Sequence, residues 1–348
     1  FAVTYTDDLG DGSSDGIRVR FYDASGTPTG DDVQVNNETG SNQSEPAIAT
    51  IQPGADANDL TNGGVVVVWT SPVGDGSSNG VFGQIYAADG TAVGTEFQIN
   101  TTTANSQSDA SVAGLDGGRF IVVWEDNSGA DGSGVGVFAQ IYEGDGTAVG
   151  SEFQVNEEFS SSQFDPEVTA TSDGGFVVSW TSVNSGTAGD GNSNGVFARR
   201  FDADGIATTD EFQINEEITF DQELSDVAPL ANGDFVTVWQ SDTQGTAGDG
   251  SGLGIFQRIF GDPATFVEPS ASPEVEAVST TRIFSENAVN AAPQRVDADG
   301  AAAVSDADST DFAGGRLILY GPFMIDGEHT ADSNREFDHW LKARDAGY

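Results

Sequence analysis

The chain has 348 residues, of which 12 are Lys or Arg and 56 are Asp or Glu, so its formal net charge is −44. Such a surface excludes nucleic acid and anionic lipid as partners, because binding to phosphates needs Lys and Arg, and it attracts divalent cations. The absence of Cys excludes disulfides, thiolate zinc sites and Cys nucleophiles, and the absence of an apolar run of about 18 residues excludes a transmembrane helix.

An internal repeat organises the chain from its first residue. Trp69, Trp124, Trp180 and Trp239 recur at intervals of 55, 56 and 59 residues, and each ends an apolar segment. Residues 1–5 form the same element with Tyr in place of Trp. Because these residues read as the middle of a strand, we expect the chain to be a piece of a larger protein.

Each repeat offers three more short segments after the Trp segment. An Asp-Gly loop leads to a second apolar segment, such as 81–86, and a turn leads to a third that ends in Gln-Val-Asn or Gln-Ile-Asn. A polar stretch with one Gln then precedes the fourth segment, such as Ser111-Val112-Ala113. Short segments rich in Val, Ile, Phe and Tyr, separated by Gly, Asp, Asn and Ser, are typical of antiparallel strands.

Four antiparallel strands in a repeat of 55–64 residues are typical of a β-propeller blade. We therefore predict an all-β fold in which residues 1–260 form a propeller-like array of about five four-stranded repeats. Tandem β-sandwiches and a β-solenoid are the alternatives. The first repeat lacks its leading strand, and the fifth has only a weak candidate for its last strand, Ala264–Glu268, so strand exchange between the two ends could close the ring.

The composition changes after residue 260. Residues 261–272 are rich in Pro, Ser and Ala, which predicts a linker. Residues 273–322 contain strand-like segments with an acidic edge and predict the start of a small β-sandwich. Residues 323–348 hold the only Lys, the only Met and both His of the chain, and we assign no function to this atypical tail.

The Asp-Gly-Ser loops that follow the Trp segments are candidate metal sites. Calcium takes about six to eight oxygen ligands, which Asp, Asn and Ser side chains and the carbonyls of Gly turns can supply. We predict calcium as a cofactor, with ligands in these loops and on the acidic edge of residues 273–322: Asp11, Asp15, Asp75, Asn79, Asp131, Asp190, Asn194, Asp249, Asp297, Asp299, Asp306 and Asp308. The alternative is a tight Gly turn in which the Asp side chain binds its own backbone.

Two other recurring features have a structural and a functional interpretation. The Trp residues could stack on sugars, but their place at the end of hydrophobic strands favours packing, and the recurring Gln and Asn favour structural hydrogen bonds. Three carboxylates break the repeat, Glu125, Asp126 and Glu223. They serve a glycosidase site or reflect sequence drift, and the sequence does not select catalytic residues among the 56 acidic ones.

The motifs also carry a family resemblance, which is most evident in Gly174–Asn215. This stretch reads Gly-Gly-Phe-Val-Val-Ser-Trp, then Asp-Gly-Asn-Ser-Asn-Gly-Val-Phe, then Asp-Gly, then Glu-Phe-Gln-Ile-Asn. It resembles repeats of very large secreted bacterial proteins with RTX-type, hemolysin-type calcium-binding segments. Residues 285–315 look like the opening of a cadherin-like or Ig-like module of such proteins.

The resemblance implies type I secretion, calcium-stabilised folding outside the cell, and roles in adhesion, surface layers or biofilm of a marine or salt-adapted bacterium. The Gly-Gly-x-Gly-x-Asp nonapeptide array of that family is absent from this sequence. Our leading hypothesis is a non-enzymatic, extracellular structural or adhesive module that binds calcium ions and surface glycans or other copies of itself. The alternatives are a lectin-like, carbohydrate-binding propeller and a secreted polysaccharide hydrolase or lyase.

Overall fold

The computed structural model describes residues 1–8, 14–54, 60, 63–132, 134–157, 159, 161–183, 194–216, 220–230, 234–242 and 253–261, and the backbone of 324–325 and 328–329. The chain divides into two compact units, Phe1–Phe266 and Val267–Tyr348. In the second unit the described residues form one small hairpin, of β19 (Met324–Ile325) and β20 (Glu328–His329). The predicted linker, the sandwich at 273–322 and most of the tail lie outside the described residues.

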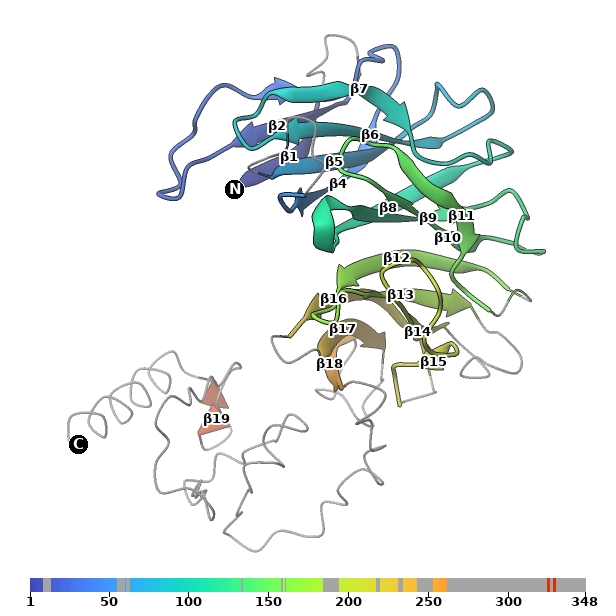
Figure 1. The fold of residues 1–348 in the computed structure, drawn as a ribbon. Coiled ribbons are helices and arrows are strands. Elements are labelled where there is room, and N and C mark those ends of the chain that lie inside the picture. The colour runs from blue at the N-terminus through green and yellow to red at the C-terminus, as the bar shows by residue number, and fades with distance from the viewer. Residues whose placement is uncertain are drawn as a thin grey trace, which may run out of the picture. The chain divides into compact units, whose positions relative to one another are not determined.

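The first unit is a row of antiparallel sheets, which we call blades 1 to 5 in chain order (Figure 1). Blade 1 contains β1 (Ala2–Asp7), β2 (Gly16–Phe21) and β3 (Val33–Gln34); blade 2 contains β4 (Ser44–Ile51), β5 (Gly64–Ser71), β6 (Gly80–Ala87) and β7 (Ala92–Gln98). Blade 3 contains β8 (Gln107–Gly114), β9 (Phe120–Asp126), β10 (Gly136–Tyr142) and β11 (Ala148–Gln154); blade 4 contains β12 (Gln163–Ala170), β13 (Phe176–Val183), β14 (Asn194–Phe201) and β15 (Phe212–Gln213). Blade 5 contains β16 (Gln222–Pro229), β17 (Phe235–Asp242) and β18 (Leu253–Phe260).

The predicted all-β, propeller-like fold is confirmed by this topology. Three blades have four strands, and blades 1 and 5 have three. Blade 1 lacks the leading strand, as the sequence indicates, and the weak candidate for the last strand of blade 5, at 264–268, lies outside the described residues. Among the described residues the sheets do not close into a barrel, because each blade keeps its own hydrogen-bonded order.

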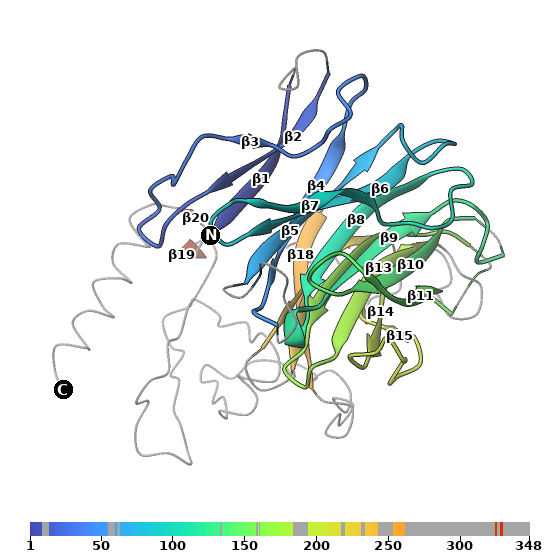
Figure 2. The ribbon, with the colours of Figure 1, turned by 45° about the horizontal axis from the view of Figure 1, so that its top comes forward.

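The first strands of blades 2 to 5, which we call the lead strands, lie side by side. Strand β4 packs beside β8, β8 beside β12, and β12 beside β16. Figure 1 shows the sheets following one another in chain order, and Figure 2 shows the same sheets after a turn of the view. Side chains at one end of the lead strands are therefore brought together from several blades.

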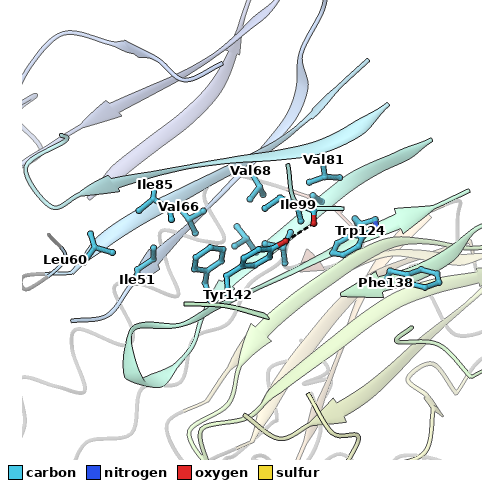
Figure 3. Close-up of a cluster of buried hydrophobic side chains, with 14 residues drawn as sticks. Ile51, Leu60, Val66, Val68, Val81, Ile85, Ile99, Trp124, Phe138 and Tyr142 are labelled. Carbon is cyan, nitrogen blue, oxygen red and sulfur yellow. Dashed lines mark hydrogen bonds between the residues drawn. The ribbon is translucent and has the colours of Figure 1, made fainter. Parts of the chain in front are cut away.

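The hydrophobic core lies between neighbouring blades. One cluster joins Val68 and Val81 of blade 2 to Trp124 and Tyr142 of blade 3 (Figure 3). The Tyr142 hydroxyl donates a hydrogen bond to the carbonyl of Ile99 across this junction, at 2.7 Å. Similar clusters fill the other three junctions. Because the middle strands of blades 2 to 4 are covered on both faces, they read as continuous apolar runs.

The recurring Asn and Gln form a buried clamp at each of the four junctions. In each clamp the Asn Nδ2 donates to the Gln Oε1, at 2.8 to 3.1 Å, in the pairs Asn36–Gln43, Asn100–Gln107, Asn156–Gln163 and Asn215–Gln222. The Asn Oδ1 also accepts a backbone N–H from the strand that follows the Trp or Tyr strand of its own blade, as Asn36 does from Ile17 at 2.7 Å. The predicted structural role of these residues is confirmed, since each Gln side chain is fully buried.

A β-bulge recurs in every lead strand, opposite the Trp. In blade 3, Ser108 pairs with Glu125 and Ser111 with Val123, so two residues of β8 stand opposite Trp124 alone. The same irregularity occurs in blades 2, 4 and 5. The first bulged residue has a positive φ in all four, 54° at Glu45, 50° at Asp109, 51° at Asp165 and 53° at Leu224. Residues other than Gly rarely adopt this backbone conformation. Bulges are common next to functional sites, where they change the direction in which a side chain points.

Candidate functional site

The bulges place acidic side chains of several blades next to one another. Three of the four bulged residues are acidic, and the Asp109 N–H donates to Glu45 Oε2 of the preceding blade at 3.3 Å. The Asp165 N–H donates to Glu125 Oε1 at 2.8 Å. Contacts across two blade junctions therefore bring the carboxylates of blades 2, 3 and 4 together into what we call the acidic cluster.

Glu125 occupies a position that is taken by a residue with a hydroxyl group in the next blade. It directly follows Trp124, as Thr181 follows Trp180. In blade 4 the Thr181 Oγ1 accepts the N–H of Leu224 at 3.3 Å, the same bond that Glu125 accepts from blade 4. The fold needs only a hydrogen-bond acceptor here, so the carboxylate of Glu125 adds a charge that the blade geometry does not require.

Burial and mutual repulsion shift the pKa values of this cluster upward. Burial raises the pKa of Glu125 to about 7, and the negative charges of Asp109 and Asp165 raise it as well. Burial raises the pKa of Asp109 to about 6, with further contributions from Glu45 and Asp165. The pKa of Asp165 is raised by burial and by the charge of Glu223. Like charges in a partly buried site cannot all ionise easily, so the cluster holds a proton near neutral pH.

The cluster continues toward blades 4 and 5. Glu167 lies two residues after Asp165, its Oε2 accepts a hydrogen bond from Ser111 Oγ at 2.7 Å, and burial raises its pKa. The Glu223 carboxylate accepts a bond from Asn194 Nδ2 at 3.2 Å. None of the ion pairs among the described residues reaches these carboxylates. A protonated carboxyl group beside ionised ones is suited to general acid and base chemistry.

Other acidic residues repeat with the blades and have structural bonds. Glu96, Glu152 and Glu211 occupy the Glu-Phe-Gln motif, and each accepts a backbone N–H from the preceding blade. The N–H groups come from the residue that follows each clamp Asn, at 2.7 to 2.8 Å. These glutamates brace the junctions, so they are not candidates for catalysis.

The residues predicted to bind calcium lie in separate loops of separate blades. Asp15 belongs to blade 1, Asp75 and Asn79 to blade 2, Asp131 to blade 3 and Asn194 to blade 4. The other predicted ligands, Asp11, Asp190, Asp249, Asp297, Asp299, Asp306 and Asp308, lie outside the described residues. In the described part of the chain, no group of three or more His, Asp or Glu side chains could hold a metal ion.

The described part of these loops has the geometry of turns. The Ser77 N–H donates to Asp75 Oδ1 at 2.9 Å, which is the bond of an Asx turn. The carbonyls of Asp15 and Asn79 accept the N–H of the clamp residues Gln43 and Gln107, both at 2.9 Å. These hydrogen bonds are those of a tight turn, and they leave the Asp75 Oδ2 atom buried without a hydrogen-bond partner. Calcium binding stays a prediction, and no step of the reaction proposed below depends on it.

The loop glycines have a packing reason. A Cβ on Gly80 would lie 2.7 Å from the Cβ of Asp75, and a Cβ on Gly136 would lie 2.9 Å from that of Asp131. Real Cβ atoms do not approach so closely, so each Asp side chain requires the glycine that begins the next strand. This close approach explains why Gly recurs at the start of the next strand.

The Trp residues pack between blades and do not form a sugar platform. Trp69, Trp124, Trp180 and Trp239 are 1%, 0%, 0% and 7% exposed. The packing interpretation therefore holds for all four.

The sequence predicts only part of the acidic cluster. The break in the repeat indicates Glu125 and Glu223, and it also indicates Asp126, whose Oδ1 accepts the Ser128 N–H at 2.7 Å. It does not indicate Glu45, Asp109 or Asp165. Each of these three follows the clamp Gln by two residues, which is the signal that could have identified them. The predicted fourth strand began at Ser111, whereas β8 begins at Gln107.

Comparison with known proteins adds little at the level of sequence. A family model described as a protein of unknown function, DUF938, matches residues 267–348, which is less than half of the chain. No curated protein sequence matches the chain.

Several solved structures are similar to the chain at low identity. A protein of unknown function from Dyadobacter fermentans is 12% identical, with a TM-score of 0.44, over 73% of this chain and 69% of its own. An endo-arabinase from Bacteroides thetaiotaomicron is 10% identical, with a TM-score of 0.41, over 74% of this chain and 88% of its own. A GH93 α-L-arabinofuranosidase of Fusarium graminearum is 11% identical, with a TM-score of 0.44, over 64% of each chain.

These comparisons contradict the predicted non-enzymatic, structural or adhesive module, because the similar structures of described activity include several glycoside hydrolases. The leading hypothesis from the sequence is therefore corrected. With TM-scores this low, the similarity says nothing about substrate or mechanism, which must be argued from the acidic cluster. Among the residues that the structure describes, no helix is long and apolar enough to cross a membrane.

Proposed function

We propose that the first unit is a polysaccharide hydrolase whose active site is the acidic cluster at the ends of the lead strands. The observation that carries this proposal is the gathering of carboxylates from three blades, in which the Asp165 N–H donates to Glu125 Oε1 at 2.8 Å and the pKa of Glu125 is raised to about 7. Hydrolysis of a glycosidic bond uses one carboxyl group that is protonated near neutral pH and a second that is ionised. The acidic cluster supplies both in one place.

Glu125 is the general acid in this proposal. Its carboxyl group is held by the Asp165 N–H at 2.8 Å, so it is oriented as well as protonated. A proton with a pKa of about 7 can be given to the departing sugar oxygen at neutral pH. The bond from the Asp165 N–H then stabilises the carboxylate that remains.

Asp109 is the ionised partner in this proposal. The pKa of Asp109 is raised to about 6 and that of Glu125 to about 7, so the pair holds a proton near neutral pH, and in this proposal Asp109 is the group that is ionised. Its carboxylate can then activate water or stabilise the positive charge that develops on the sugar ring. The two groups interact, so they titrate as a pair.

The surface charge selects a neutral substrate. With a net charge of −44, the chain repels polymers of uronic acid or sulfated sugars, whereas a neutral polysaccharide meets no such barrier. Polysaccharides are too large to cross a membrane unaided, so this substrate agrees with the extracellular location predicted from the sequence.

The test is release of reducing ends from neutral polysaccharides, namely arabinan, xylan, mannan and laminarin. We expect activity on at least one of them, and Glu125→Gln and Asp109→Asn should each lower kcat by about 100-fold or more. Glu38→Gln is the matched control, because the Glu38 side chain is exposed and accepts a local bond from the Gly40 N–H. The activity should fall above pH 7 as Glu125 loses its proton.

Two outcomes would reject the proposal. One is a folded wild-type protein with no activity on any of the four neutral polymers. The other is a Glu125→Gln variant that keeps wild-type kcat, since an amide cannot supply the proton.

A further inference from the structure

Strand β9 of blade 3 departs from the repeat a second time, directly after Glu125. The second residue after the Trp is a serine in blades 2, 4 and 5, namely Ser71, Ser182 and Ser241, whereas blade 3 has Asp126. The three serines are between 1% and 3% exposed, and Asp126 is 1% exposed. A buried position at which a hydroxyl group satisfies the fold therefore holds a carboxylate in blade 3.

One oxygen of the Asp126 carboxylate is buried without a hydrogen-bond partner. The Oδ1 atom accepts the Ser128 N–H at 2.7 Å, but the Oδ2 atom has no such partner. Burial raises the pKa of Asp126 despite the bonds from Ser128, and the charge of Glu152 raises it as well. None of the ion pairs among the described residues includes Asp126. Because a buried charge is costly unless it is paired, ionised Asp126 needs a positive partner.

Blade 1 shows how a carboxylate at this position can be balanced. Asp7 is the counterpart of Asp126, since each follows the aromatic residue of its strand by two positions. The Arg18 Nε lies 3.2 Å from the Asp7 Oδ2, so a guanidinium group supplies the positive charge in blade 1. The residue at the position of Arg18 in blade 3 is Phe138, which has no charge to offer.

A second carboxylate lies on the same face of blade 3. Asp126 stands opposite Gly136 in the ladder, and the Asp131 Oδ2 lies 2.9 Å from the place that a Cβ on Gly136 would take. Side chains of directly opposite residues share one face of a sheet, with their Cβ atoms about 5 Å apart. Trp124 is on this face too and packs against blade 2 (Figure 3). Asp131 is 8% exposed, so two buried carboxylates are gathered at one end of this face.

We propose that Asp126 and Asp131 bind one calcium ion at the end of β9. Their two negative charges balance the charge of the ion, and calcium takes its remaining ligands from neutral oxygens such as backbone carbonyls and water. Ligands divided between a strand end and a loop suit the flexible coordination of calcium better than the strict octahedron of magnesium. In blade 2 the same place holds Asp75 and Ser71, so only one carboxylate is present there.

This site goes beyond the calcium ligands predicted from the sequence, which include Asp131 but not Asp126. The ion takes no part in the proposed reaction, so the site can be tested without measuring activity. Replacing Asp126 with the serine of the other blades should remove the site and keep the fold, because three blades bury a serine at this position.

The experiment is a thermal melt of the full chain in about 1 mM calcium and in excess chelator, at fixed ionic strength. We expect calcium to raise the melting temperature of the wild type by about 5 °C or more, and Asp126→Ser to lose most of this rise. In chelator, Asp126→Ser should melt at or above the temperature of the wild type, because it lacks the unpaired buried carboxylate. Asp116→Ser is the matched control, since Asp116 is exposed at the opposite end of blade 3, and it should respond like the wild type.

A calcium titration followed by calorimetry should give one bound ion fewer for Asp126→Ser than for the wild type. Asp126→Asn is the second variant, which keeps the shape of the side chain and decides the matter if Asp126→Ser does not fold. Equal calcium responses of the wild type and the folded variant overturn the proposal, and so does a wild type that calcium does not stabilise. An equal rise in matched magnesium also overturns it, because the effect is then general screening of the acidic surface.

Discussion

The clamp residue Gln107 and the acidic-cluster residue Asp109 lie two residues apart in the sequence. The residue type at the clamp position is the same in every repeat, whereas the residue type at the cluster position varies. Gln107 is bound by Asn100 at 3.1 Å, as its counterparts are at the other three junctions. Asp109, two residues later, has the counterparts Glu45, Asp165 and Leu224. The backbone of this second position repeats in every lead strand, but its side chain does not.

The difference separates what the fold requires from what it permits. A clamp side chain that is fully buried must satisfy polar groups on two blades, and only one residue type fits all four junctions. The bulge fixes the backbone at φ values near 50° but leaves the side chain free to vary. Chemistry can therefore be placed at the bulges without changing the junctions, and the acidic cluster lies at these positions.

The clamp gives the largest expected effect on stability. Asn36→Ala removes the acceptor of the Ile17 N–H and the donor to Gln43, and leaves both buried without those partners. We expect a loss of about 3 kcal/mol in the free energy of unfolding, measured by urea titration. Asn37→Ala is the matched control, because the Asn37 side chain is exposed and its backbone N–H still binds Glu96. Equal losses of unfolding free energy in the two variants would mean that the clamp Asn contributes no more to stability than an exposed Asn.

Removing a charge from the acidic cluster is expected to stabilise the folded chain, whereas removing a clamp residue destabilises it. The pKa of Glu125 is about 7 in the folded chain against an ordinary value of 4.5, so the folded state binds the proton more tightly than the unfolded state. Stability due to this group is therefore full below about pH 4.5 and is lost as the pH rises to 7. Glu125→Gln should match the wild type at pH 4.5 and be more stable at pH 8, by up to about 3 kcal/mol.

Urea titrations at the two pH values measure this difference, with Glu38→Gln as the control. Gln keeps an oxygen that can accept the Asp165 N–H, so the variant tests the charge and not the hydrogen bond. A difference of the same size at both pH values would mean that Glu125 ionises normally in the folded protein.

The sequence predicts the blades better than it predicts the site, for a physical reason. Alternation and continuous apolar runs depend on neighbours along one strand, so β5, β9 and β13 could be recognised from residues 65–69, 120–124 and 176–180. The acidic cluster depends on contacts between residues far apart in sequence, such as Asp165 and Glu125. The bulges that aim these side chains follow from register, which the polar start of β8 at Gln107-Ser108-Asp109 does not reveal.

The loops give the smallest expected effect and test the remaining prediction of calcium. Asp75→Asn keeps an oxygen that can accept the Ser77 N–H, so we expect the free energy of unfolding to change by less than about 0.5 kcal/mol. Asp75→Ala removes that acceptor and should cost about 1 kcal/mol. Thermal melts of both variants with millimolar calcium and with excess chelator separate a turn from a metal ligand. If calcium raises the melting temperature of the wild type but not of Asp75→Asn, the Asp75 carboxylate binds the ion; if both variants respond like the wild type, Asp75 is a turn residue alone.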